Sequence, residues 1–165
     1  MSDTIACVEL LERIGRSWDG LQGAVGGLDD ERLAAPGPDG WSIKDHLAHV
    51  AAWEAYLLGV LDGADSRAAL GIEAASDTDE ENEIIRRRYA AMPAAEVRRL
   101  LADTHARTVR RIEALGDRGL SMPFTHYQPG TTRKDRDSPI AGWVGGNTCE
   151  HYEEHRSWIL ALAGR

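Results

Sequence analysis

Residues 147–159 read Asn-Thr-Cys-Glu-His-Tyr-Glu-Glu-His-Arg-Ser-Trp-Ile, and we interpret them as the start of the last helix. His151 and His155 are four residues apart, so on a helix they project from the same face and could bind one metal ion. Asn147 can serve as the N-cap, with Glu150 reaching back to its amide as in a capping box. The alternative is that the two histidines only pack against neighbours or face solvent.

A second informative stretch lies about a hundred residues upstream, at residues 41–54. Ser42 followed by Asp45 predicts a capping box at the start of a helix, and Trp41 can pack against its first turns. The apolar residues of this helix share one face with His49, which therefore points toward the core. A buried imidazole without a partner costs about 1–3 kcal/mol, so His49 must either bond to neighbours in the core or bind a ligand.

Two further amphipathic helices are predicted. Apolar side chains recur every three or four residues over residues 7–25, which is the stripe of a helix that Ser2 or Asp3 could cap. A later helix, opened by Pro93, carries a similar stripe over residues 97–115.

The segments between these helices differ in character. Residues 61–77 form a long connection with a helical turn near residues 67–70, and a further helix is expected over residues 79–92. Residues 116–146 are expected to be irregular. No segment shows the alternation typical of a strand. We therefore predict a single all-α domain over residues 1–165, folded as a four-helix bundle.

Composition narrows the classes of function. The 165 residues carry a formal net charge of −8, which argues against a general affinity for nucleic acid or for anionic membranes. No segment resembles a signal peptide or a membrane span. The two cysteines, Cys7 and Cys149, have no spacing typical of a zinc site or redox pair, so we expect reduced thiols and a cytoplasmic location.

In a four-helix bundle, metal sites are built from side chains on facing helices. His49 together with His151 and His155 would supply three neutral nitrogen ligands and leave positions open for water or substrate, as catalytic sites do. Zn²⁺ and Ni²⁺ both accept imidazoles, so the ligands do not distinguish them. A bound ion lowers the pKa of bound water toward about 7, or polarises a substrate oxygen or thiol.

Other side chains could complete the site. Three could orient a ligand or transfer a proton: Glu54, Tyr152 and Glu154. Three aromatic side chains could shape an apolar pocket: Trp53, Tyr127 and Trp143. The sequence leaves open whether His46, His126 or a carboxylate joins the metal ligands.

The two stretches together resemble a known family. Residues 41–50, Trp-Ser-Ile-Lys-Asp-His-Leu-Ala-His-Val, resemble the hallmark of the DinB/YfiT-like superfamily. Residues 147–155 resemble its second signature, in the form found in the ClbS/DfsB branch. The resemblance covers most of the chain and implies an up-up-down-down four-helix bundle, often dimeric. It also implies a three-histidine metal site, which maps onto His49, His151 and His155.

The resemblance implies several functions. Members of the superfamily include thiol-dependent transferases and isomerases, hydrolases, and proteins that protect their hosts from reactive natural products. We therefore expect a metal-assisted hydrolase or thiol transferase that acts on a small electrophilic molecule, in detoxification or self-resistance. Its partners would be that substrate, a low-molecular-weight thiol if it is a transferase, and a second copy of the chain in a homodimer.

Two alternatives belong to other classes. Within the ClbS/DfsB branch a metal is not always needed, so the chain could be a metal-free protein that binds and sequesters a reactive small molecule. It could also be an interaction module with a vestigial site, because Cys149 lies off the helix face that carries His151 and His155 and cannot act there as a nucleophile.

Overall fold

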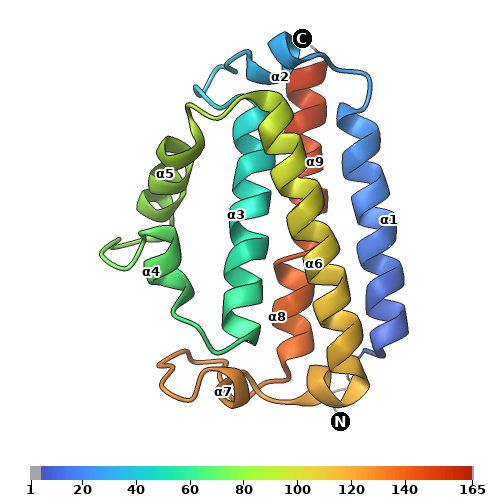
Figure 1. The fold of residues 1–165 in the computed structure, drawn as a ribbon, viewed down its shortest axis with the longest axis vertical. Coiled ribbons are helices and arrows are strands. Elements are labelled where there is room, and N and C mark those ends of the chain that lie inside the picture. The colour runs from blue at the N-terminus through green and yellow to red at the C-terminus, as the bar shows by residue number, and fades with distance from the viewer. Residues whose placement is uncertain (1–4, 165) are drawn as a thin grey trace.

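The computed structural model describes residues 5–164, and within them it contains nine helices and no strand, which confirms the all-α prediction. Four long helices form the bundle: α1 (Cys7–Val25), α3 (Ile43–Leu61), α6 (Ala94–Ser121) and α9 (Cys149–Ala163). Five short helices connect them: α2 (Asp30–Ala34), α4 (Ser66–Leu70), α5 (Thr78–Tyr89), α7 (Phe124–Tyr127) and α8 (Ile140–Gly146). Figure 1 shows α4 and α5 on the outside of the bundle, beside α3.

The long helices pack as two parallel pairs. In Figure 1, α1 and α9 run upward and pack together, whereas α3 and α6 run downward and pack together. The directions along the chain are therefore up, down, down and up. Counted around the bundle, in the order α1, α9, α3 and α6, two neighbouring helices run up and two run down. Parallel neighbours cannot be joined by a tight turn, which explains the long crossover from α3 to α6 through α4 and α5.

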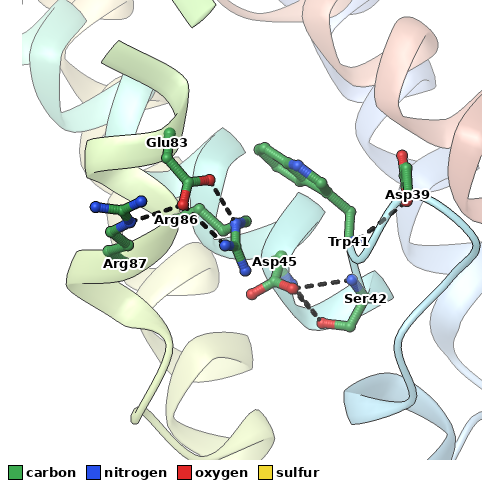
Figure 2. Close-up of polar contacts among 7 residues, drawn as sticks. All are labelled: Asp39, Trp41, Ser42, Asp45, Glu83, Arg86 and Arg87. Carbon is green, nitrogen blue, oxygen red and sulfur yellow. Dashed lines mark hydrogen bonds and ion pairs between the residues drawn. The ribbon is translucent and has the colours of Figure 1, made fainter. Parts of the chain in front are cut away.

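The start of α3 is fixed by its own side chains. Ser42 Oγ accepts a hydrogen bond from the Asp45 amide at 3.1 Å, and the Ser42 amide donates to Asp45 Oδ2 at 2.9 Å, which confirms the predicted capping box (Figure 2). The Trp41 ring lies 5.2 Å from the His46 ring, centroid to centroid. This contact between the residue before the cap and the second turn is the predicted staple. It orients the first turns of the helix that carries His49.

Other predicted helix starts differ in detail. The predicted caps Ser2 and Asp3 lie outside the described residues, and α1 begins at Cys7. Pro93 precedes α6 as its N-cap instead of opening the helix. The predicted last helix is present, but its predicted capping box of Asn147 and Glu150 is wrong, since α9 begins at Cys149 after Thr148 and none of the described side chains caps it. Asn147 instead ends α8, where its side-chain amide donates to the carbonyl of Trp143 at 2.9 Å.

The prediction that residues 116–146 are irregular is wrong in large part. Helix α6 continues to Ser121 after a break at Gly116, where φ is 57° and ψ is −170°. Helices α7 and α8 follow, and α8 lies below α9 as the lower part of the fourth rod (Figure 1). Apolar side chains along this segment are fully or almost fully buried, among them Leu120, Ile140 and Val144. Their burial outweighs the low helix propensity of the glycines around them.

The main core lies between the four long helices. Its largest buried side chains include Leu10, Ile14, Leu47, Leu57, Leu101 and Ile112. A second, smaller cluster formed by Ala52, Leu70, Ile72 and Ile85 attaches α4 and α5 to α3. Helix α5 is thereby held on the outer side of α3, where it contributes to the cavity described below. None of the described helices has the length and apolar character needed to cross a membrane.

Candidate metal centre

The structure brings together the three histidines that the sequence singles out. His49 lies on α3, and His151 and His155 lie one turn apart on the neighbouring α9. One nitrogen from each ring lies within 4.8 Å of the others. The ring centroid of His155 is 4.7 Å from that of His49 and 4.5 Å from that of His151. Two helices from distant parts of the chain thus form one compact group of imidazoles, here named the histidine cluster.

Burial keeps the histidine cluster neutral. The pKa of His49 is lowered to about 3, mainly by desolvation and further by the neighbouring His151 and His46. Desolvation also lowers the pKa of His151 to about 4. The pKa of His155 is lowered too, first by burial and then by the three histidines around it. Near neutral pH the rings therefore carry lone pairs that a metal ion can accept.

Two atoms of the cluster lack a partner. Nδ1 of His49 and Nδ1 of His151 are buried and have no hydrogen-bond partner among residues 5–164. Leaving a buried polar atom unpaired costs about 1–3 kcal/mol. Neutral imidazoles with unsatisfied nitrogens are suitable ligands for a divalent ion such as Zn²⁺ or Ni²⁺, so the residues present fit a metal site of this kind.

A fourth histidine contacts the cluster. Nδ1 of His46 lies 3.0 Å from Nδ1 of His155, so one of the two nitrogens carries the proton of this hydrogen bond. His46 is buried, and desolvation lowers its pKa. It is not one of the three residues whose nitrogens come within 4.8 Å of one another. His126, the other histidine that the sequence left open, is exposed on α7.

A cavity of about 680 Å³ opens beside the histidine cluster. This volume is in the range of sites for drug-sized ligands. Its walls come from the segment before α3, from α3 and α5, and from α9. Trp53, a predicted pocket residue, lines the cavity, and so does Glu154, a predicted acid or base on α9.

The other two predicted pocket residues lie elsewhere. The Tyr127 hydroxyl donates to the carbonyl of Gly119 at 2.9 Å, which ties α7 to the end of α6. Trp143 packs edge-on against Phe124, with ring centroids 5.2 Å apart. Neither Tyr127 nor Trp143 lines the cavity. Helix α7 lies at the opposite end of the bundle from α2, as Figure 1 shows.

Two predicted acid–base residues belong to a separate buried network. Glu54 and Tyr152 are both fully buried, and the Tyr152 hydroxyl donates to Glu54 Oε1. Nδ1 of His105 lies 3.0 Å from the Tyr152 oxygen and 3.4 Å from Glu54 Oε1. The Trp18 ring stacks on His105 at 3.7 Å between centroids. Desolvation raises the pKa of Glu54, and neither Glu54 nor Tyr152 lines the cavity.

His105 is the residue that sequence reasoning missed in this network. It lies on α6, and its partners come from α1, α3 and α9. The sequence carries only a weak signal for it, namely a histidine next to Thr104 and Thr108 on the buried side of a predicted helix. We refer to Glu54, His105 and Tyr152 as the buried network.

Both cysteines are free thiols in the structure. The Cys149 thiol is buried and points to the carbonyl of Gly145 at 3.5 Å. The Cys7 thiol points to the carbonyl of Ile112 at 3.6 Å, and burial raises its pKa. Neither cysteine lines the cavity.

Comparison with known proteins identifies the family and the fold. The family model described as the DinB superfamily matches residues 13–159. No curated protein matches the sequence. One similar solved structure is described as the colibactin self-resistance protein ClbS in complex with a dsDNA. It has a TM-score of 0.74 and 14% identity, and the match covers 98% of this chain and 97% of that one.

Two other solved structures are similar. One is described as the sibling lethal factor precursor DfsB, with a TM-score of 0.69, 20% identity, and coverage of 93% of this chain and 92% of that one. Another is a protein from Streptococcus pneumoniae, with a TM-score of 0.72, 14% identity, and coverage of 94% and 88%. At these identities the structural likeness shows the fold alone.

Proposed function

The chain belongs to the DinB superfamily, and from this premise we propose that it is a metal-assisted enzyme that acts on a small electrophilic molecule. His49, His151 and His155 would hold a divalent ion, Zn²⁺ or Ni²⁺. The observation that carries the proposal is the histidine cluster, in which three neutral nitrogens lie within 4.8 Å of one another beside a cavity of ligand size. Such an ion supplies Lewis acidity, which suits either hydrolysis or the transfer of a thiol.

The residues of the chain have distinct parts in this proposal. Burial holds the histidine cluster neutral, so the imidazoles need not lose a proton before a metal ion binds to them. His46 orients the ring of His155 through their shared hydrogen bond. Glu154 has an exposed carboxylate at the cavity wall, where it can accept a proton from a bound molecule.

Elemental analysis of untagged protein tests the metal site directly. We expect about one Zn or Ni per chain in the wild type, and its loss in the His49→Ala, His151→Ala and His155→Ala variants. His126→Ala is the matched control, because His126 is exposed on α7 and should not affect the metal content. Full metal content in His151→Ala or His155→Ala would refute the assignment, provided that circular dichroism shows intact helices.

A second proposal is a metal-free protein that protects its host by sequestering a reactive molecule. The apolar cavity, with tryptophans among its lining residues, supports this reading. One structural neighbour is described as a self-resistance protein, which is consistent with it. Counting turnovers separates the two proposals. Many substrate molecules consumed per chain support an enzyme, whereas stoichiometric protection that survives loss of all three cluster histidines supports sequestration.

Nucleic acid is a further partner to test, because the structure of ClbS contains a double-stranded DNA. We propose that this chain has no general affinity for DNA, since its net charge is −8. Fluorescence anisotropy of a labelled duplex in low salt should show no saturable binding at micromolar protein. Binding that weakens steeply with added salt would contradict this expectation.

We also propose a cytoplasmic location and assembly as a homodimer. Two free cysteines are consistent with a reducing, cytoplasmic environment. A homodimer is proposed from the family resemblance, and light scattering coupled to gel filtration would test it.

A further inference from the structure

The cavity beside the histidine cluster has flat aromatic walls. Three of the five tryptophans in the chain line it: Trp41, Trp53 and Trp158. The ring centroids of Trp41 and Trp53 lie 5.6 Å and 6.1 Å from that of His49. The ring centroid of Trp158 lies 4.9 Å from that of His155. The Trp158 residue is 46% exposed, although it is large and apolar. Indole faces attract flat unsaturated groups and cations, so a bound molecule of this kind would cover the exposed ring.

The acidic and basic side chains among the described residues that line the cavity are all acidic, apart from the histidines. Asp39 and Glu154 are carboxylates at the cavity wall, and no lysine or arginine occurs among the described residues that line it. The Asp39 carboxylate is fixed beside Trp41, because its Oδ1 accepts the Trp41 amide hydrogen bond at 3.0 Å (Figure 2).

Three basic side chains near the cavity, Lys44, Arg86 and Arg87, already donate hydrogen bonds to other groups. Glu83 accepts hydrogen bonds from Arg86 at 2.8 and 2.9 Å and from Arg87 at 2.7 Å, as Figure 2 shows. The Lys44 ammonium donates to the carbonyls of Ala90 and Met92 at 2.7 and 3.1 Å. None of these three basic side chains lines the cavity.

We infer that this cavity takes a flat, unsaturated small molecule whose part away from the histidine cluster is neutral or carries an amine, and that the cavity wall discriminates against carboxylates. The inference deepens the proposed function and rests on it in taking the cavity as the substrate site. It also bears on thiol transfer. Away from the ion that the histidine cluster would hold, a thiol rich in carboxylates would meet Asp39 and Glu154, and no basic side chain among the described residues lines the wall to bind it. A transferase built on this cavity therefore uses a thiol that is uncharged or carries an amine.

Binding of three probes with the same ring tests the inference: 2-naphthylmethylamine, 2-naphthalenemethanol and 2-naphthoate. In protein treated with a chelator, isothermal titration calorimetry should show the amine binding at least about tenfold more tightly than the carboxylate, because two carboxylates lie in the wall. The double variant Asp39→Asn with Glu154→Gln should reduce this ratio by about tenfold. Trp158→Ala should weaken the binding of all three probes by a similar factor.

The matched control is Glu153→Gln, because Glu153 neighbours Glu154 on α9 but pairs with Arg156 and does not line the cavity. It should leave the ratio unchanged. Equal binding of amine and carboxylate, an unchanged ratio in the double variant, or no binding of any probe at millimolar concentration would each overturn the inference. Metal content is measured on the same samples, before and after chelation. Wild-type protein that takes up no divalent ion even after reconstitution would refute the proposed metal site, whereas the amine-to-carboxylate ratio of the chelated protein tests the inference alone.

Discussion

Mild acid should destabilise the metal-free protein through the histidine cluster. The pKa of His49 is about 3 and that of His151 about 4 in the folded chain, against 6.5 for an ordinary histidine. Between pH 6.5 and about 4 the unfolded chain therefore binds protons that the folded chain does not bind. The stability that these rings contribute is fully present above pH 6.5 and is lost as the pH falls toward their folded pKa values.

The size of the effect follows from the pKa difference. Each proton that only the unfolded chain binds lowers the free energy of unfolding by about 1.4 kcal/mol per pH unit. From pH 7 to pH 5, His151 should account for a loss of about 2 kcal/mol, and His49 for a similar amount. Together they would remove about 4 kcal/mol, a large part of the 5–15 kcal/mol roughly typical of a folded domain.

The assay is urea unfolding followed by circular dichroism at pH 5, 6 and 7, with a chelator present. The informative quantity is the slope of the unfolding free energy with pH, because acid also acts on carboxylates throughout the chain. In His151→Gln the slope should be smaller by about 1 kcal/mol per pH unit, whereas His126→Gln should retain the wild-type slope. If His151→Gln and the wild type have the same slope, His151 is not kept neutral by burial and the electrostatic argument for the cluster fails.

Three further substitutions test the framework around the site. Tyr152→Phe removes the hydroxyl that donates to Glu54 and should lower the free energy of unfolding, measured in urea, by about 1–3 kcal/mol. The metal content should not change. An unchanged free energy of unfolding would contradict the buried network. Ser42→Ala removes the capping box of α3 and should cost about 0.5–2 kcal/mol, seen as a lower midpoint in thermal unfolding. Gly116→Ala places a side chain where φ is 57° and ψ is −170° and should cost about 1–3 kcal/mol by the same measurement.

The fold was predictable where local signals agreed with burial. The stripes of α1 and α6 repeat every three or four residues, and the capping box marks the first turn of α3. Helix α8 was missed because Gly142, Gly145 and Gly146 lower its local helix propensity. Its stability comes from Ile140 and Val144, which are buried against helices distant in sequence. Local helix propensity alone does not reveal such tertiary contacts.

Within the candidate site, the residues whose positions follow from helix periodicity were predictable, and those whose positions depend on tertiary packing were not. The spacing of His151 and His155 defines their shared face without any knowledge of the tertiary structure. The positions of Tyr127 and Trp143 depend instead on the path of a long segment, and no periodicity specifies that path. His105 was missed for a related reason, since its partners are brought to it only by the packing of α6 against the other helices.

Helix geometry explains why Tyr152 and Glu54 face the core and not the cavity. Successive residues of a helix are rotated by about 100°, so Tyr152 cannot share the face of its neighbour His151. Glu54 follows His49 by five residues, a net rotation of about 140°, and is turned away in the same manner. The same two helices thus carry two clusters on different faces, one beside the cavity and one in the core.

The buried network therefore fixes the rotation of α9 about its own axis. The Tyr152 ring is fully buried and its hydroxyl joins α9 to α3 through Glu54 and to α6 through His105. With Tyr152 held in the core, His151 just before it and His155 about one turn after it must face His49. Removing only the hydroxyl leaves the ring in place, so stability should fall while the histidines stay together. Removing the ring would free the rotation of α9 and disperse the ligands, which makes Tyr152 a positioning residue for the proposed metal site and not an acid or base within it.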